Sequence, residues 1–165
     1  MSNHQKEFKF ANPPKSISYL EGEPLKLTEQ FDFFHNKSKI RKSLNKLQYL
    51  FKSYTKTPLL ASGIRDSYLT EEFTDEYLII LFTTPEIVKD TNSILTKYSD
   101  VKISKENFLL ITTQEYMLLL AKNIDAINSG VDYIEEILKQ VLEDYFGKKE
   151  FEDFIKIRQF SLSNL

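Results

Sequence analysis

The sequence predicts a small single-domain α/β sandwich with two central parallel strands, at about residues 77–83 and 108–112, in strand–helix units that follow a basic amphipathic helix. Three observations favour this fold class. Two apolar runs typical of buried strands each lead into a helix-start signal, the segment "LFTTPEIV" recurs as "LITTQEYM", and a helical periodicity precedes both. Two successive strand–helix units imply parallel pairing, because the returning chain must cross over the sheet.

The length of the chain indicates one domain. At 165 residues, a second independent core would leave each half short of buried surface. Residues 1–30 hold Pro13, Pro14, Gly22 and Pro24 among short apolar stretches without a sustained period, so we expect an extended N-terminal arm. Residues 31–165 are then the single α/β domain.

The first predicted helix is the basic one, at about residues 37–56. Asn36 suits an N-cap, and the helix should end by Thr57, because Pro58 disfavours helical dihedrals in the residue before it. Apolar residues spaced by four and three positions lie on one helical face: Ile40, Leu44, Leu47, Phe51 and Tyr54. A short strand near residues 59–61 would follow.

The first strand–helix unit begins with the apolar run from Tyr77 to Thr83, which is rich in strand-favouring residues. Thr84 is the expected cap of the following helix, and Pro85 suits its first turn, where the missing N–H costs nothing. This helix should extend to about Tyr98. A short edge strand is expected at residues 101–103.

The second unit begins with "NFLLI". Thr112 and Glu115 match a capping box, in which the hydroxyl accepts from the N3 amide and the carboxylate returns to the cap's own N–H. The helix should continue to Asn128 and stop at Gly130, and a third helix, at about residues 132–145, should end at Gly147. The pattern of residues 148–165 leaves helix and strand open.

The composition argues against several enzyme classes, so an enzyme is the less favoured interpretation. The absence of cysteine excludes disulfides, thiolate nucleophiles and cysteine-based metal sites. The two histidines, His4 and His35, form no pair spaced for a metal, and no glycine-rich loop or nucleophile turn is present. The two Thr-Thr pairs are interpreted as helix caps rather than phosphate sites, because Glu86 and Glu115 already place a carboxylate in each first turn. No cofactor is expected.

The acidic segment "RDSYLTEEFTDE" is the one option for metal chemistry. Its carboxylates, which could hold Mg²⁺ in a nuclease-like site, are Asp66, Glu71, Glu72, Asp75 and Glu76. No lysine follows at the spacing that such nucleases use, and runs of carboxylates are usually solvated. We therefore interpret the segment as surface charge and keep the metal-dependent enzyme as a third hypothesis.

The strongest departure from an even mix of charge is the basic stretch between Asp32 and Asp66, which has no acidic residue. Its eight basic residues are Lys37, Lys39, Arg41, Lys42, Lys46, Lys52, Lys56 and Arg65. The rest of the chain carries 14 basic and 24 acidic residues, and the predicted third helix is acidic, with Asp132, Glu135, Glu136, Glu143 and Asp144 against Lys139. The basic and acidic helices could therefore neutralise each other, within one chain or between chains.

The charge pattern supports two function hypotheses. The first is a non-enzymatic interaction or regulatory module that self-associates or binds another protein, with the basic helix docked on an acidic surface. The alternative is a nucleic-acid-associated domain that binds backbone phosphates through the same helix, with an exposed aromatic residue available for stacking. Either way the binding residues are Lys37, Lys39, Arg41, Lys42, Lys46, Lys52 and Lys56. The longest apolar run, Tyr77–Phe82, is far below the roughly 18 residues that span a bilayer, and the N-terminus lacks an apolar signal core, so no membrane partner and a cytoplasmic location are expected.

Overall fold

A computed structural model describes residues 7–27, 32–54, 66–68, 78–84, 87, 89–147 and 155–163. The strands are β1 Ser16–Tyr19, β2 Leu25–Leu27, β3 Asp32–His35, β4 Asp66–Tyr68, β5 Leu78–Thr83, β6 Phe108–Thr112, β7 Tyr116–Ala121, β8 Ile155–Ile157 and β9 Phe160–Ser163. The helices are the short 3₁₀-helix η2 Ser38–Ile40 and the α-helices α1 Arg41–Tyr54, α4 Thr91–Lys97 and α5 Ile124–Phe146. Seven strands form one sheet in the order β1-β9-β6-β7-β5-β3-β4, and β2 pairs with β8 in a second sheet.

The predicted α/β sandwich with parallel central strands is wrong. The two predicted strands exist as β5 and β6, but they are not neighbours, because β7 lies between them and pairs antiparallel with both. Leu118 of β7 faces Leu81 of β5 on one side and Ile111 of β6 on the other. The described sheet is antiparallel throughout, apart from the pairing of β3 with the short edge strand β4.

The second Thr-Thr segment explains the error, because it forms a β-hairpin and not the start of a helix. Thr112 ends β6, and the turn closes with a bond from the Thr113 N–H to the Tyr116 carbonyl (2.8 Å). The Thr113 hydroxyl accepts from the N–H groups of Glu115 (3.1 Å) and Tyr116 (3.2 Å). The predicted capping box of Thr112 and Glu115 is therefore absent. The six residues of β7 are all buried between two strands, which outweighs the local helix signal.

The first Thr-Thr segment precedes a helix, α4. The Ile87 N–H donates to the Thr84 carbonyl (3.1 Å), and α4 then begins at Thr91. The two segments are therefore not one repeated strand–helix unit. Residues 101–103 form no strand, although Ile103 is buried, while Pro85, Glu86 and the strand expected at residues 59–61 lie outside the described residues.

Helix α5 replaces the two helices predicted around Gly130. Asn123 is its N-cap and accepts from the Ala126 N–H (2.8 Å), and the helix ends at Gly147 as predicted. Gly130 does not stop it. A Cβ atom at Gly130 would lie 2.8 Å from Leu119 Cδ2, so the glycine lets α5 approach β7 closely.

The predicted basic helix exists as α1, although α1 begins at Arg41, after η2, and not at residue 37. Ile40, Leu44, Leu47 and Phe51 are fully buried, as their spacing predicts, and Tyr54 is partly buried. Asn36 is buried as well, and its side-chain oxygen accepts from the Ile79 N–H (3.0 Å), which ties the start of this segment to β5. The outward face of α1 is therefore set by the same spacing that the sequence shows.

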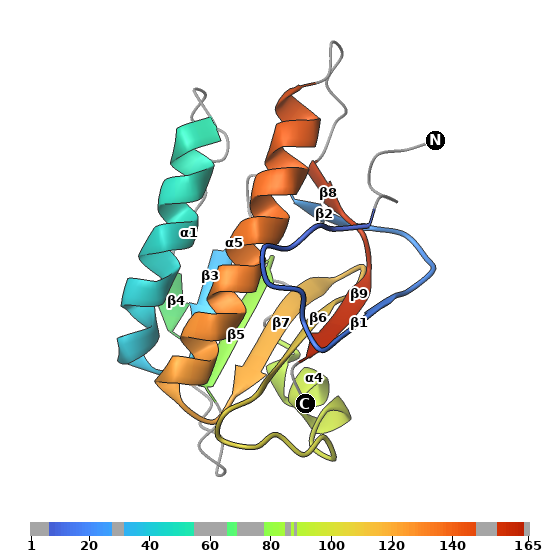
Figure 1. Cartoon of the computed structure of the whole chain (residues 1–165). Helices are drawn as coiled ribbons and strands as arrows, with labels where there is room; N and C mark the ends of the chain where they lie inside the picture. Colours follow the sequence, from blue (N-terminus) through green and yellow to red (C-terminus); the bar gives the residue numbers. More distant parts are fainter. Residues whose placement is uncertain are drawn as a thin grey trace.

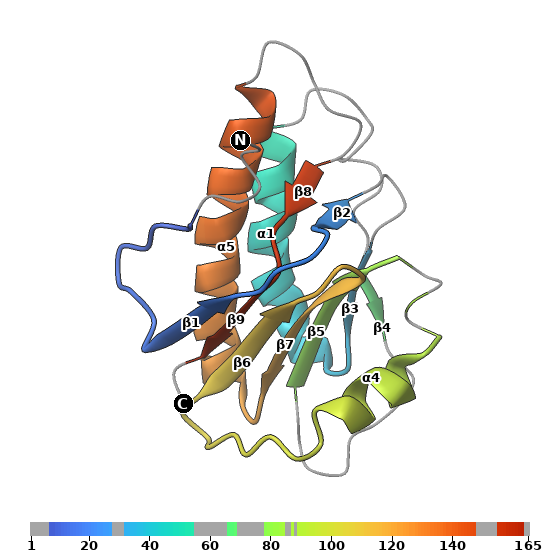
Figure 2. The same ribbon diagram turned by 90° about the vertical axis from the view of Figure 1, so that its right-hand side faces the viewer.

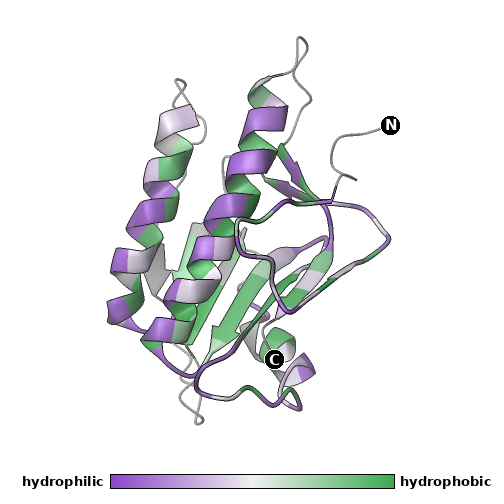
Figure 3. Ribbon diagram, in the orientation of Figure 1, coloured by the Kyte–Doolittle hydropathy of each residue, from purple (hydrophilic) through white to green (hydrophobic). Residues whose placement is uncertain are grey.

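Helices α1 and α5 lie side by side on one face of the large sheet, and α4 lies on the other face (Figures 1 and 2). The core has two parts accordingly. Under α1 and α5, Phe33 stacks on Phe82 with ring centroids 4.6 Å apart, whereas Ile94 and Leu95 of α4 pack with Ile79 and Leu118 on the other face. Figure 3 shows hydrophobic strands between helices that alternate hydrophobic and hydrophilic residues.

Both ends of the described chain join the sheets. The expected arm, residues 1–30, contains β1 and β2, which pair with β9 and β8. Helix and strand were both open for residues 148–165, and the described part of this range, residues 155–163, contains the strands β8 and β9. These pairings bring residues 16–27 next to residues 155–163, far apart in sequence.

Candidate functional site

The candidate site is a cleft of about 310 Å³ lined by residues of η2, α1 and α5. The burial of Leu44 and Leu47 against the core turns the polar residues of α1 outward. The polar residues that line the cleft are Lys39, Lys42, Ser43 and Lys46 from η2 and α1, with Asn128 and Asp132 from α5.

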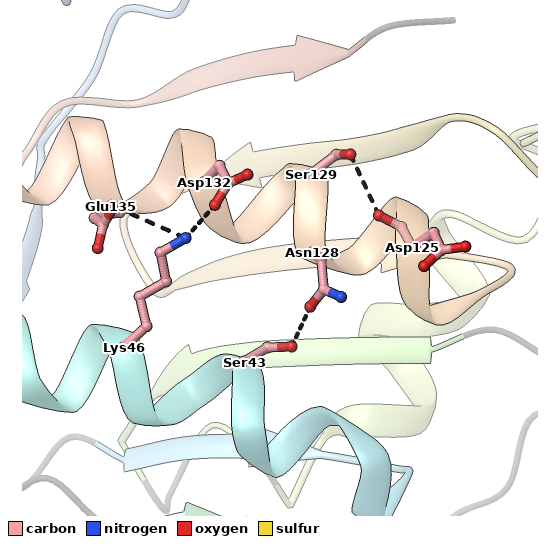
Figure 4. A network of polar contacts seen from close by, with 7 residues as sticks. All are labelled: Ser43, Lys46, Asp125, Asn128, Ser129, Asp132 and Glu135. Carbon is pink, nitrogen blue, oxygen red and sulfur yellow. Dashed lines mark hydrogen bonds and ion pairs between the residues drawn. The ribbon is translucent and has the colours of Figure 1, made fainter.

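Polar contacts join α1 to α5 at the cleft (Figure 4). The Ser43 hydroxyl donates to the Asn128 side-chain oxygen, and the Lys46 ammonium group donates to a carboxylate oxygen of Asp132. The Glu135 carboxylate lies 3.8 Å from the same ammonium group. The hydrogen bond to Asp132 raises the pKa of Lys46, partial burial opposes the rise, and the charges of Asp132 and Glu135 add to it.

The other basic residues of the site differ from Lys46. Lys37, Lys39 and Lys42 are exposed, and within the described part of the chain their ammonium groups make no ion pair. Arg41 and Lys52 belong to α1, but their side chains lie outside the description, and Lys56 lies outside the described residues. Of the predicted binding residues, the structure therefore brings Lys39, Lys42 and Lys46 together at one cleft.

An exposed aromatic ring lies further along the same helix. Tyr49 is 75% exposed, and its spacing from Lys42 and Lys46 places all three on one side of α1. Tyr54 differs, because its hydroxyl donates to a carboxylate oxygen of Glu143 on α5 (2.8 Å). Burial, followed by the contact with Glu143, raises the pKa of Tyr54.

Sequence reasoning missed Ser43 and Asn128. It ended a helix at Asn128, so this residue could not be placed opposite α1. The missed signal was Asn123, an N-cap residue with Asp125 in the first turn after it, which indicates a helix that starts there.

The residues considered for metal chemistry do not add to this site. Asp66 lies in the edge strand β4, while the other carboxylates of the acidic segment, Glu71 to Glu76, lie outside the described residues. Among the residues that the structure does describe, no three acidic or histidine side chains are close enough to hold a metal ion. His35 is buried, with its Nδ1 atom 3.0 Å from the Lys37 carbonyl oxygen.

A second hollow, of about 250 Å³, lies where the two Thr-Thr segments meet β2. Thr83, Thr84, Gln114 and Glu115 line it together with Lys26. The proton of the Thr83 hydroxyl is already donated to the Glu115 carbonyl (2.6 Å), so it is not available to a ligand. One lysine and one carboxylate, Lys26 and Glu115, line this hollow, whereas three lysines and one carboxylate line the cleft beside α1, which therefore suits an anion better.

Comparison of the chain with protein-family models, with curated proteins and with solved structures gave no match. A separate search of the helices in the described residues found none with the length and apolar character needed to cross a bilayer. The cleft and the exposed face of α1 are therefore the features from which a function can be inferred.

Proposed function

We propose that the protein is a non-enzymatic interaction module that docks the basic face of α1 on an acidic protein surface, either that of a second copy or that of another protein. The observation that carries this proposal is the pair of exposed lysines, Lys39 and Lys42, which line the cleft at the start of a helix without acidic residues. Such a surface attracts carboxylates and steers their approach at low salt.

The contact made by Lys46 supports a protein carboxylate as the partner group. In this contact, an ammonium group of α1 binds two carboxylates that a neighbouring helix presents one turn apart, Asp132 and Glu135. A partner helix with acidic residues at the same spacing could approach Lys39 and Lys42 in the same manner. The chain's own acidic excess makes a second copy a candidate partner.

The alternative, a nucleic-acid phosphate backbone, is favoured by one observation, the exposure of Tyr49. An aromatic ring beside lysines can stack on a base while the ammonium groups contact phosphates. The carboxylates of Asp132 and Glu135 at the same cleft oppose this alternative, because they repel phosphate.

The test compares the double variant Lys39→Glu/Lys42→Glu with a matched control, Lys89→Glu/Lys102→Glu, which makes the same charge change at two exposed lysines outside α1 and α5. Lys46 is left unchanged, because a carboxylate there would face Asp132 and Glu135. Sedimentation velocity at low and physiological salt measures self-association. We expect the first variant, and not the control, to reduce the salt-sensitive assembly.

Titration with a fluorescent single-stranded oligo(dT) separates the two functions. Salt-dependent oligo(dT) binding that disappears in Lys39→Glu/Lys42→Glu, with unchanged mass, would favour the nucleic-acid alternative. In that case each lost phosphate contact should reduce the log–log salt slope by roughly 0.7. If neither assembly nor oligo(dT) binding responds to the variant, the basic face is not the binding surface for either.

A further inference from the structure

Helices α1 and α5 run in the same direction along the sheet (Figure 1). Hydrogen bonds between their described side chains join them at three levels, and α1 is the donor each time. The pairs are Ser43–Asn128, Lys46–Asp132 and Tyr54–Glu143. Both members of each pair advance together along the chain, so each bond marks one level along the axes of two parallel helices.

The outward ridge of α1 is basic. It is formed by Lys39 at the end of η2 and by Lys42, Lys46 and Tyr49 of α1, which are spaced by three and four residues. Lys39, Lys42 and Tyr49 are exposed, and neither η2 nor α1 contains an acidic residue. We call these four residues the basic ridge.

The outward ridge of α5 is acidic. Its carboxylates are spaced by seven, four and seven residues, which keeps them on the side of α5 opposite its buried residues: Asp125, Asp132, Glu136 and Glu143. Ser129 lies exposed between the first two of them. Within α5, Lys139 is the one basic residue against six acidic ones. The four carboxylates form the acidic ridge, which lies beside the basic ridge on the same outward face.

A face with one basic and one adjacent acidic ridge is complementary to itself. Two orientations about a two-fold axis keep the helices of two copies aligned. An axis perpendicular to the helices places each basic ridge on the basic ridge of the other copy, where like charges repel. An axis parallel to the helices places each basic ridge on the acidic ridge of the other copy, at the same level.

We propose that the basic ridge docks on the acidic ridge of a second copy, in a dimer whose two-fold axis is parallel to α1 and α5. This inference rests on the proposed docking function of α1 and names its partner. The level of the Ser43–Asn128 bond places Lys42 within about one helical turn of Asp125 of the other copy. Carboxylates that already accept a hydrogen bond within one chain still take part, because an ionised carboxylate has about four acceptor sites.

The size of the face predicts a weak dimer. Helix α1 has 14 residues and is about 21 Å long, and two helices side by side are roughly 20 Å wide, so each copy contributes roughly 400 Å². The total of roughly 800 Å² is below the standard interface size. Because charge pairs dominate this contact, salt should dissociate it. Tyr49, which is 75% exposed, is the expected aromatic anchor.

Reversing the charge of each ridge in turn tests the pairing, with sedimentation velocity at low salt and high protein concentration as the measurement. Lys39→Glu/Lys42→Glu makes both ridges of a copy acidic, and Asp125→Lys/Ser129→Lys makes the facing parts of both ridges basic. Each variant alone should stay monomeric, because like charges then face each other. An equimolar mixture of the two should form a heterodimer, because every facing pair is then opposite in sign.

The matched control for the α5 variant is Ser93→Lys/Asp100→Lys, the same two changes at exposed residues of α4 and the turn after it. It should dimerise as the wild type does and form no heterodimer with Lys39→Glu/Lys42→Glu. Circular dichroism melting checks the fold of each variant. If lysine at position 125 prevents folding, Asp125→Asn/Ser129→Lys replaces the α5 variant and should give the same pattern with a smaller heterodimer fraction.

A wild type that stays monomeric, or two variants that fail to associate on mixing although the wild type dimerises, would overturn this dimer. Binding of fluorescent poly-L-glutamate separates that failure from failure of the proposed function. If the wild type binds poly-L-glutamate and Lys39→Glu/Lys42→Glu does not, α1 docks on an acidic surface other than α5 of a second copy. If this binding is also unchanged in the variant, both proposals are wrong.

Discussion

The two Thr-Thr segments begin alike and become different structures. After Thr83 the chain leaves the sheet, and the Ile87 N–H donates to the Thr84 carbonyl in a turn that precedes α4. After Thr112 the chain reverses in a hairpin and forms β7. They meet at one end of the sheet, where the Thr83 hydroxyl donates to the Glu115 carbonyl. The residues that follow each Thr-Thr pair differ in apolar content. The first pair is followed by "EIVKD", which contains three charged residues, and the second by "YMLLLA", whose six residues are buried between β5 and β6.

A helix-start signal therefore contributes less than the burial of a complete strand. A capping interaction contributes about 0.5–2 kcal/mol, whereas each fully buried large apolar side chain contributes about 1.5–3 kcal/mol. Because β7 buries several such side chains, the hairpin prevails over the capping box.

Removing a buried side chain from the second segment should have the largest effect. Leu119→Ala in β7 should lower the free energy of unfolding by about 2–5 kcal/mol, because Leu119 is fully buried against Gly130 of α5. Ile87→Ala in the first segment, where the side chain is half-buried, should cost less than Leu119→Ala. Urea unfolding measures both, and equal losses would contradict the comparison.

The same substitution at the two strand-ending threonines should have opposite signs. Thr83→Val should destabilise the fold by about 1–2 kcal/mol, because it removes the donor to the Glu115 carbonyl. Thr112→Val should stabilise it by about 1 kcal/mol, because the Thr112 hydroxyl is buried without a hydrogen-bond partner in the described residues. Thermal unfolding of both variants checks the signs, and destabilisation by Thr112→Val would support the capping interpretation instead.

Tyr116, in the second segment, should make the stability of the fold sensitive to alkaline pH. Burial, followed by the hydrogen bond with Tyr98 (2.8 Å), raises the pKa of Tyr116 well above its value in the unfolded chain. Stability should therefore fall above about pH 10, where the unfolded chain releases this proton first, with a slope of up to about 1.4 kcal/mol per pH unit. Tyr116→Phe should cost about 0.5–1.5 kcal/mol at neutral pH and make the alkaline fall shallower. An unchanged slope in urea unfolding at pH 9 to 11 would refute this.

The smallest change in stability is expected for an exposed ion pair, which serves as a reference for the buried sites. Lys46→Met removes the ion pair with Asp132 but keeps the aliphatic stem on α1, and the side chain of Lys46 is 39% exposed. The free energy of unfolding should change by no more than about 1 kcal/mol, and less at high salt. A loss as large as that of Leu119→Ala would place the α1–α5 contact among the main determinants of the fold.

The sequence by itself determined the helix α1, the run of β5, the strand β6, the stop at Gly147 and the clustering of positive charge on one helix. Each of these depends on local periodicity, on the position of a glycine or proline, or on the charges within one helix. The lysines of the candidate site could be named for the same reason. Asp132, the partner of Lys46, and Asn128, the partner of Ser43, could not be placed opposite α1, because that requires the length and register of α5.

Only the tertiary structure decided which strands are neighbours, that residues 116–121 form a strand, and that α5 passes through Gly130. A run such as "YMLLLA" is apolar on every side, so its periodicity cannot distinguish a buried helix from a central strand. Residues 116–121 form a strand because they pair with β5 on one side and with β6 on the other. Likewise, Gly130 weakens an isolated helix but lets α5 pack against Leu119, a gain that exists only once both elements are in contact.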